Sequence, residues 1–294
     1  MKQLSLFPEY PASLPVVNVA SVPQRSPFRY PGGKTWLVPV IRRWFASFAH
    51  KPQEFVEPFA GGAIIGLTAA FEQLAEHVTL VELDAAVAAV WQTVIEDGEG
   101  VWLAEQIEQF ALTPANVQTL LQQTNLPLRE RALQTIVKNR VNRGGILAPG
   151  AGKLKFGEAG KGIGSRWYPQ TLKKRILDIH AIRQRLTFIS GDGISVLRDR
   201  AGQPKVVFFI DPPYTADGKR AGSRLYTHND LDHEELFAVV QSLAGDFLMT
   251  YDANDRIRAL AQQHGFDVEL IPMKNTHHAA MVELLIGRDL RWLR

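Results

Sequence analysis

The sequence predicts an α/β fold built around a doubly wound, mostly parallel sheet, and two segments carry this prediction. Residues 54–71 combine a strand, a glycine turn at Gly61-Gly62 and an apolar helix, a unit typical of such folds. Residues 206–210, Val-Val-Phe-Phe-Ile, form an apolar run that predicts a strand buried on both faces, as strands of parallel sheets are.

Other elements follow from the same patterns. Strands are expected over 78–82, 187–190 and 247–251, with a terminal hairpin over 268–271 and 281–286. Amphipathic helices are expected after Trp36 and after Asp232, and residues 85–135 are mainly helical in pattern. Lys274, His277 and His278 fall at the tip of the hairpin, and no third ligand at suitable spacing supports a metal site.

Length and composition limit the class of protein. The chain has 294 residues, of which 46% are hydrophobic and 21% charged, as expected of a globular protein with a proper core. No apolar run approaches the length of a membrane span, and Pro8 and Glu9 interrupt the N-terminus where a signal peptide would need an apolar core. The absence of cysteine excludes disulfides and thiolate metal sites and favours the cytoplasm.

Residues 1–27 carry five prolines (residues 8, 11, 15, 23 and 27) and no periodic pattern, which predicts an extended, largely disordered arm. Its start, Gln3-Leu4-Ser5-Leu6-Phe7, resembles the short peptide with which bacterial replication and repair proteins dock on the sliding clamp. Gln3, Leu4, Leu6 and Phe7 are the candidate clamp-binding residues. An apolar tail without a partner is the alternative.

Residues 28–36, Phe-Arg-Tyr-Pro-Gly-Gly-Lys-Thr-Trp, form a glycine-rich turn that enters a helix. The Gly-Gly-Lys-Thr string does not fit a P-loop, because Phe28 stands where the first glycine is required and no strand precedes it. The remaining interpretations are a ligand-contacting turn and a plain helix start with a solvated lysine.

Acidic residues follow two predicted strands. Glu82 lies at the tip of the strand 78–82, where doubly wound folds use an acid to bind ribose hydroxyls, and Asp84 is the neighbouring alternative. Either could instead cap a helix. Asp192 follows the strand 187–190, and a turn-forming role is about as plausible for it as a ligand contact.

Basic residues gather between Arg129 and Arg175 and alternate with glycines. Such a segment can follow phosphates and place side chains in a groove, so we expect nucleic-acid binding here; a solvated basic loop is the alternative. The candidate DNA-binding residues are Lys138, Asn139, Arg140, Arg143, Lys153 and Lys155.

The strand 206–210 ends in Asp211-Pro212-Pro213-Tyr214. Prolines cannot donate to a sheet ladder, so the strand must stop there, with Asp211 and Tyr214 at its carboxyl end, where ligands bind in open α/β sheets. An ordinary turn is the alternative. A carboxylate and the Pro212 carbonyl can accept both hydrogens of an exocyclic amine, and Tyr214 can stack on a base.

Four motifs in this order resemble the D12-class, Dam-like DNA adenine-N6 methyltransferases over residues 28–288. They are the aromatic-Gly-Gly-Lys turn, Phe-x-Gly at Phe59 and Gly61, the basic segment with its Asn139-Arg140 pair, and Asp-Pro-Pro-Tyr. Ala63 departs from the family's second glycine. The resemblance implies a Rossmann-like methyltransferase fold ending in an antiparallel hairpin, with an inserted helical domain.

The resemblance also implies roles. Asp211, Pro212 and Tyr214 would be catalytic, S-adenosylmethionine would be the methyl donor without a metal, and double-stranded DNA would be the substrate. The residues expected at the cofactor are Tyr30, Gly33, Lys34, Phe59, Gly61, Glu82, Asp192 and Asp211. The expected catalytic domain covers 28–95 and 186–294, and the target-recognition domain covers 96–185.

Alternatives remain at this point. Cytosine-N4 transfer is one, although those enzymes more often carry Ser before Pro-Pro-Tyr. Methylation of RNA or of a protein amide is another, although the protein enzymes favour Asn at the position of Asp211. A catalytically idle DNA-binding regulator is the rival of another class, and the intact Lys34 and Asp211 argue against it. A monomer is expected, because one flipped base needs one site.

Overall fold

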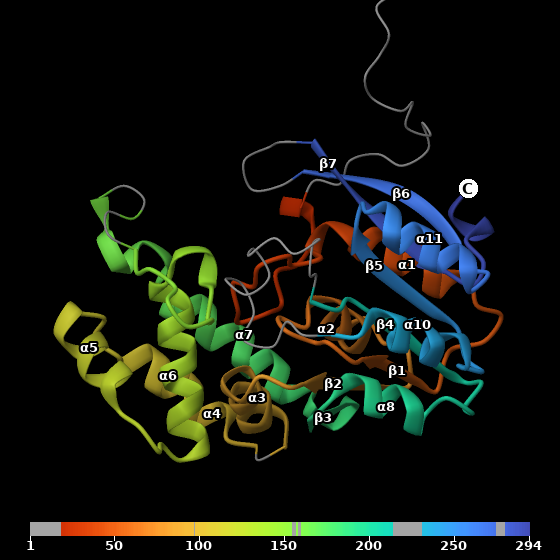
Figure 1. The fold of residues 1–294 in the computed structure, drawn as a ribbon. Helices are drawn as coiled ribbons and strands as arrows, with labels where there is room; N and C mark the ends of the chain where they lie inside the picture. The colour runs from red at the N-terminus through yellow and green to blue at the C-terminus, as the bar shows by residue number, and fades with distance from the viewer. Residues whose placement is uncertain (1–18, 97, 155–156, 158–159, 214–230, 275–279) are drawn as a thin grey trace, which may run out of the picture.

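A computed structural model of the chain describes residues 19–96, 98–154, 157, 160–213, 231–274 and 280–294. Within these residues seven strands form one sheet, in the order β3-β2-β1-β4-β5-β7-β6 (Figure 1). The strands are β1 Glu54–Glu57, β2 His77–Glu82, β3 Leu186–Ser190, β4 Val206–Ile210, β5 Phe247–Asp252, β6 Asp267–Lys274 and β7 Ala280–Gly287.

The pairing of the strands confirms the predicted fold class. β1 pairs in parallel with β2 and β4, β3 with β2, and β5 with β4. β7 runs antiparallel to both β5 and β6, which is the predicted terminal hairpin. The chain winds from β1 toward β3 and later from β4 toward β5, so the direction of winding reverses between β1 and β4, where α/β sheets bind ligands.

Helices connect the strands. They are α1 Val38–Ala46, α2 Ile64–Phe71, α3 Ala85–Trp91, α4 Gly100–Gln109, α5 Pro114–Gln122, α6 Leu128–Val141, α7 Pro169–Ala181, α8 Gly193–Asp199, α10 His233–Gln241 and α11 Asp255–Gln263. Asp232 caps α10, as expected, by accepting from the backbone N–H groups of Glu234 and Glu235. No helix of the described ranges combines the length and apolar character that crossing a membrane requires.

The apolar run 206–210 forms β4, whose side chains are buried on both faces of the sheet. Val207 and Phe209 belong to one buried cluster with α1, α2 and α3. The alternate residues Val206, Phe208 and Ile210 belong to a second cluster with α8, α10 and α11. Since successive side chains of a strand point to opposite faces, helices cover both faces of the sheet, and every residue of β4 is buried.

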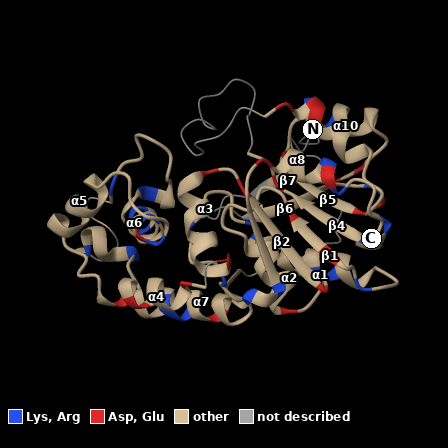
Figure 2. Cartoon of the chain, turned by 90° about the horizontal axis from the view of Figure 1, so that it is seen from below, with Lys and Arg blue, Asp and Glu red and all other residues tan. Residues whose placement is uncertain are grey.

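Helices α4, α5 and α6 extend to one side of the sheet, with α3 between, in the views of Figures 1 and 2. Their buried side chains, among them Leu103 and Ile136, belong to the same cluster as those of α1 and α2. These helices lie in the range 96–185 that the sequence assigns to target recognition, and the domain bounds stay a prediction.

The N-terminal arm differs from its prediction where the structure describes it. Val22, Ser26 and Pro27 are buried, and Arg25 pairs with Glu72 at 3.1 Å. After a short 3-10 helix over Val19–Ser21 the segment packs against the core, because buried apolar contacts and this ion pair offset the entropy of ordering it. Residues 1–18, with the candidate clamp peptide, lie outside the described residues.

The start of α8 gives a test of how tightly the end of β1 is packed. A Cβ added at Gly193 would lie 2.1 Å from the carbonyl oxygen of Pro58, which follows β1. Because that atom belongs to the backbone, we expect Gly193→Ala to lower the free energy of unfolding by about 1–3 kcal/mol, measured by urea denaturation. Gly202→Ala is the matched control, since a Cβ at Gly202 meets nothing within 4 Å. Equal stability of the two variants would contradict the prediction.

Candidate active site

The carboxyl ends of β1, β2 and β4 lie side by side, because these strands are adjacent and parallel. Each end carries a carboxylate: Glu57 on β1, Glu82 on β2 and Asp211 just after β4. The strand order therefore brings together two acids that the sequence assigned to the site and one, Glu57, that it did not.

Asp211 is held by two side chains from elsewhere in the chain. Its Oδ1 lies 3.1 Å from Nζ of Lys34 and accepts a hydrogen bond of 2.8 Å from the hydroxyl of Thr250 on β5. Two donors on one oxygen fix the orientation of the carboxylate, while the side chain stays 22% exposed. The predicted catalytic acid and the predicted cofactor lysine are thus in direct contact.

Lys34 is almost fully buried and has a second carboxylate partner. Its Nζ lies 3.3 Å from Oε2 of Glu283, on β7, and donates to the carbonyl of Gly32 at 3.2 Å. Burial alone would lower the pKa of Lys34, but the charges of Asp211 and Glu283 outweigh burial and raise it. The ammonium therefore stays charged between two acids.

Sequence reasoning missed Glu283. The available signal was an acid inside the apolar run 281–286, which is unusual in a buried strand. Burial raises the pKa of Glu283 to about 7, the charge of Lys34 opposes this rise, and the charge of Asp211 adds to it.

Glu57 ends β1 and anchors the helix that follows. Its Oε2 accepts a 2.7 Å hydrogen bond from the backbone N–H of Gly66 in the first turn of α2. Burial raises the pKa of Glu57 well above its usual range, and the charges of Asp211 and Glu82 add to the rise although the bond from Gly66 opposes it. This acid supports the turn between β1 and α2.

The glycine turn between β1 and α2 forms as predicted. Ala63, which replaces a family glycine, adopts a left-handed conformation with φ of 51°, so the substitution changes strain rather than the course of the turn. A Cβ at Gly61 would lie 2.6 Å from Cε1 of Tyr30, so the tyrosine ring lies directly on the turn. Two of the predicted cofactor residues, Tyr30 and Gly61, are therefore in contact.

The structure gives Glu82 and Asp84 different positions. Glu82 accepts hydrogen bonds of 2.8 Å from the backbone N–H groups of Gly61 and Asp84, and burial raises its pKa to about 7. Asp84 caps α3 by accepting from Ala86 and Val87. Glu82 thus remains the candidate for the ribose contact.

The remaining predicted cofactor residues to be placed are Asp192, Phe59 and Gly33. Asp192 is exposed and caps α8 by accepting from Ile194 and Ser195, the structural role that the sequence left open. Phe59 is half-buried against the second core cluster, and the N–H of Gly33 donates to the carbonyl of Tyr30 at 3.2 Å. Their contact with a cofactor stays a prediction.

The predicted DNA-binding residues separate into two groups. Arg143 and Lys153 are exposed, whereas Asn139 is fully buried and Arg140 is 5% exposed. Lys138 is half-buried and donates to the carbonyl of Leu147 at 2.9 Å. Burial removes Asn139 and Arg140 from direct contact with DNA in this conformation, a correction that the sequence could not supply.

Other predicted residues lie outside the described ranges. These are Tyr214, Lys155, the clamp peptide residues Gln3, Leu4, Leu6 and Phe7, and the hairpin-tip histidines His277 and His278. In the part of the chain that is described, no group of three or more His, Asp or Glu residues could hold a metal ion.

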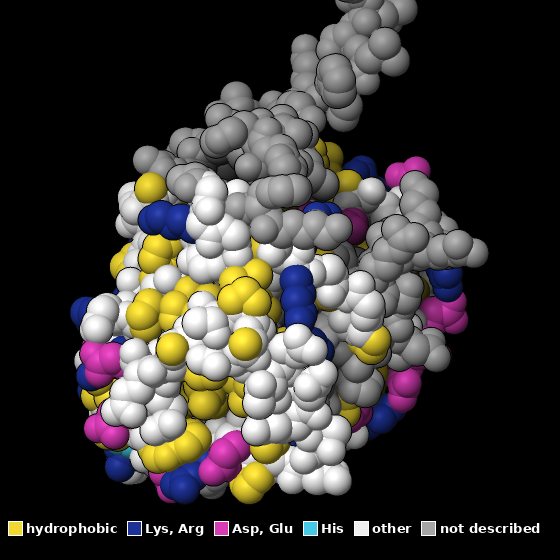
Figure 3. Space-filling view, turned by 90° about the vertical axis from the view of Figure 1, so that its left-hand side faces the viewer, with side chains coloured by type: hydrophobic (Ala, Val, Ile, Leu, Met, Phe, Trp, Pro, Cys, Tyr) yellow, Lys and Arg dark blue, Asp and Glu magenta, His cyan; other side chains and the backbone are white. Residues whose placement is uncertain are grey.

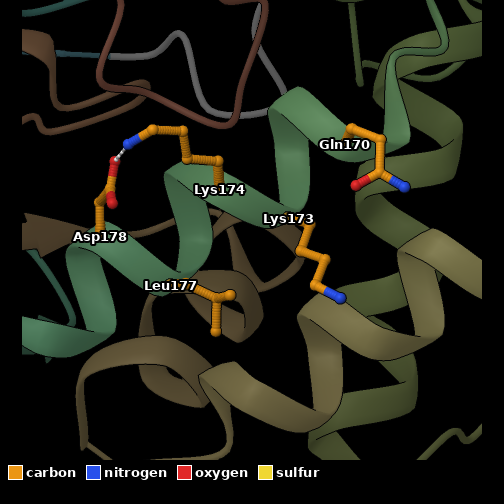
Figure 4. Close-up of a pocket in the computed structure, with 5 residues that line it drawn as sticks. All are labelled: Gln170, Lys173, Lys174, Leu177 and Asp178. Atoms are coloured by element: carbon orange, nitrogen blue, oxygen red, sulfur yellow. Dashed lines mark hydrogen bonds and ion pairs between the residues drawn. The ribbon is translucent and has the colours of Figure 1, made fainter.

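A surface depression lies on α7, and none of its lining residues belongs to the strand ends (Figure 4). It is lined by Gln170, Lys173, Lys174, Leu177 and Asp178. Lys174 pairs with Asp178 at 2.6 Å, and Lys173 turns away to pair with Glu108 on α4. Since its charges are already paired and its residues come from one helix, we do not assign it to the active site.

The sheet is doubly wound and contains one antiparallel strand, β7. An acid, a lysine and a glycine turn lie at its switch point. Together these features define a Rossmann-like methyltransferase. Residues 30–277 match the family described as D12 class N6 adenine-specific DNA methyltransferase. The chain belongs to this family and is a methyltransferase enzyme of that class. No curated protein sequence matches the chain.

Two solved structures that match the chain show low sequence identity to it. The rRNA methyltransferase aviRa from Streptomyces viridochromogenes is 13% identical, with a TM-score of 0.40 over 90% of this chain and 88% of that one. The protein yhhF from Escherichia coli, a candidate methyltransferase, is 14% identical, with a TM-score of 0.38 over 92% and 90%. The fold assignment therefore rests on the sheet itself and on the family match.

The raised pKa of Glu283 predicts a pH dependence of stability. A carboxyl whose pKa rises from 4.5 to about 7 on folding holds its proton to higher pH in the folded state, so stability falls as pH rises through this window. Glu283→Gln removes this loss. From about pH 5 to about pH 8, the free energy of unfolding of the variant should therefore rise by up to about 3 kcal/mol relative to that of the original chain.

Urea denaturation at several pH values measures this difference. Glu76→Gln, which changes an exposed acid, is the matched control and should leave the pH dependence as it is. A Glu283→Gln curve parallel to that of the unaltered chain would contradict the burial of a titrating Glu283.

Proposed function

We propose that the chain transfers a methyl group from S-adenosylmethionine to N6 of a flipped adenine in double-stranded DNA. The contact of Lys34 and Thr250 with one oxygen of Asp211 is the observation that carries this proposal. It orients a carboxylate at the switch point of the sheet, where the reaction of this family requires an acceptor for an amino group.

The residues at this edge fit the cofactor. Adenosine needs an acceptor for its ribose hydroxyls, and Glu82 offers one beside the glycine turn. Tyr30 on Gly61 offers an aromatic face, and Lys34, buried between Asp211 and Glu283, would hold Asp211 at the edge of this site. When bound, S-adenosylmethionine supplies an electrophilic methyl group on sulfur.

Asp211 and Pro212 would act on the amino group. The lone pair of adenine N6 is delocalised into the ring, so the amine is a poor nucleophile. The Asp211 carboxylate and the Pro212 carbonyl would each accept one of its hydrogens, which favours a pyramidal nitrogen whose lone pair points at the methyl group. The negative charge of Asp211 would also stabilise the positive charge that develops on N6 during transfer, and the proton that the methylated nitrogen loses would pass through this carboxylate to solvent.

Tyr214 would stack on the flipped base, and residues 96–185 would recognise the target site. The exposed Arg143 and Lys153 support a phosphate-binding role for residues 142–153, which we call the basic loop. At the outer end of the helical group, Lys and Arg side chains are scattered among uncharged ones rather than gathered into one patch (Figure 3). DNA binding would therefore depend on the basic loop more than on the helices.

The test is mass spectrometry of nucleosides from duplex DNA incubated with the protein and S-adenosylmethionine. We expect N6-methyladenine, and we expect Asp211→Ala to lower the rate by at least about 100-fold, because the amine loses its charged acceptor. DNA binding, followed by fluorescence anisotropy, should stay within about twofold, since Asp211 acts on the amine rather than on phosphates.

Asp199→Ala, at an exposed position at the end of α8, is the matched control and should keep full activity. Near-normal turnover of Asp211→Ala would refute the role of its carboxylate. N4-methylcytosine in place of N6-methyladenine would refute the choice of base.

We also propose that residues 3–7 bind a bacterial sliding clamp, with Leu4, Leu6 and Phe7 as apolar anchors for a hydrophobic groove. Immobilised clamp should retain the chain and should lose about 10-fold or more of the bound fraction with the double change Leu6→Ala and Phe7→Ala. Lys2→Ala is the control and should bind as before. Equal retention of all three proteins would exclude this interaction.

A further inference from the structure

The segment that leads into Tyr30 is held by helices α6 and α7, which lie in the predicted target-recognition range. The residues just before Tyr30 form backbone hydrogen bonds with side chains of α6 and α7. Arg175 of α7 donates to the carbonyl of Ser26 at 2.9 Å, and Arg140 of α6 donates to that of Pro27. The conformation of the segment that leads into Tyr30 therefore depends on helices far along the chain.

Asn139 makes the central contact, and it uses its whole amide group. Its Oδ1 accepts from the N–H of Arg29 at 2.9 Å, and its Nδ2 donates to the carbonyl of Arg29 at 2.9 Å. The same Nδ2 donates to the carbonyl of Gly145 at 2.6 Å. One buried side chain thus joins the residue before Tyr30 to the basic loop.

The backbone of the basic loop also touches Arg29 directly. A Cβ at Gly145 would lie 2.0 Å from the carbonyl oxygen of Arg29, and Gly145 has φ of +75°. Only glycine allows both this approach and this conformation. Arg143, two residues earlier, is exposed, and its N–H closes the loop by donating to the carbonyl of Gly152 at 2.9 Å.

We propose that Asn139 and Gly145 are positioning residues that couple DNA binding at the basic loop to cofactor binding at Tyr30. This inference rests on the proposed function, and it gives Asn139 a different role from a direct DNA contact. DNA that fixes Arg143 and Lys153 also fixes Gly145, and through it both peptide groups of Arg29. Each ligand then orders the segment around Arg29 and Tyr30. Binding of one ligand lowers the entropic cost of binding the other, so each strengthens binding of the other.

The positive charges around the contact between Asn139 and Arg29 also favour coupling between DNA binding and cofactor binding. Burial, followed by the positive charges of Arg175, Arg29 and Arg166, lowers the pKa of Arg140 to about 9. Burial lowers the pKa of Arg29 as well, followed by the charge of Arg166. A DNA phosphate near this group would reduce the mutual repulsion of the guanidinium groups, which favours the arrangement that holds Tyr30.

The experiment measures binding of S-adenosylhomocysteine by calorimetry, with and without saturating fragmented chromosomal duplex DNA. This product replaces the methyl donor, so no transfer occurs during the titration. DNA should tighten binding to the original chain by about fivefold or more. Asn139→Ala should still bind each ligand alone, and in both Asn139→Ala and Gly145→Ala the ratio of the two affinities should fall to about one.

Asn116→Ala is the matched control, because Asn116 is exposed on α5 and also donates its amide to a backbone carbonyl, that of Ala111. It should keep the ratio of the original chain. Loss of stability alone would lower the melting temperature without changing the ratio, so melting curves separate the two effects. If Asn139→Ala does not fold, Asn139→Ser, which removes the same amide, is titrated in its place.

Retention of the original ratio in the Asn139 and Gly145 variants would overturn the inference. So would an original chain that binds both ligands independently. An original chain that binds neither S-adenosylhomocysteine nor DNA would instead refute the proposed function.

Discussion

The sharing of one buried ammonium by two carboxylates organises the candidate active site. Lys34 comes from the loop before α1, Asp211 from the end of β4 and Glu283 from β7, so three distant parts of the chain meet at one charge. Buried charges are tolerated only when paired, and removal of the lysine would leave two acids in a poorly solvated space. The position of Asp211 therefore depends on Lys34, near the start of the chain, and through it on Glu283, near the end.

The same physical requirement shapes the neighbouring strand ends. Glu57 and Glu82 each accept from a backbone N–H of the glycine turn or of the helix after it. Their pKa values are raised by burial, whereas Asp211 is partly exposed and in contact with an ammonium. Acids close together in space thus have different environments, which is the condition under which neighbouring carboxylates can take different roles.

The sequence indicated what depends on local pattern. The strand that ends at Asp211, the glycine turn and the terminal hairpin follow from apolar periodicity and from the conformational limits of proline and glycine, and the structure has all three. Glu283 was missed because its partner Lys34 lies 249 residues away, and no local rule pairs them.

Asn139 illustrates the same limit from the other direction. Its basic, glycine-rich neighbourhood predicted contact with DNA, but its partner is the backbone of Arg29, 110 residues earlier. Composition describes the average character of a segment. Which face of α6 turns toward the protein is decided by packing, and that face carries Asn139.

The packing of the helical group also limits how the enzyme can respond to DNA. Side chains of α4, α6 and α7 belong to the cluster that covers one face of the sheet, and α3 contacts α6 directly. A hinge between the two parts would have to open this continuous apolar core, and cores are packed too densely to deform gradually. The basic loop contributes only Leu147 to this cluster, so it can shift while exposing less apolar surface than a hinge between the two parts would. A response to DNA is therefore expected in the basic loop and the turn that it touches, with the helices acting as a rigid support.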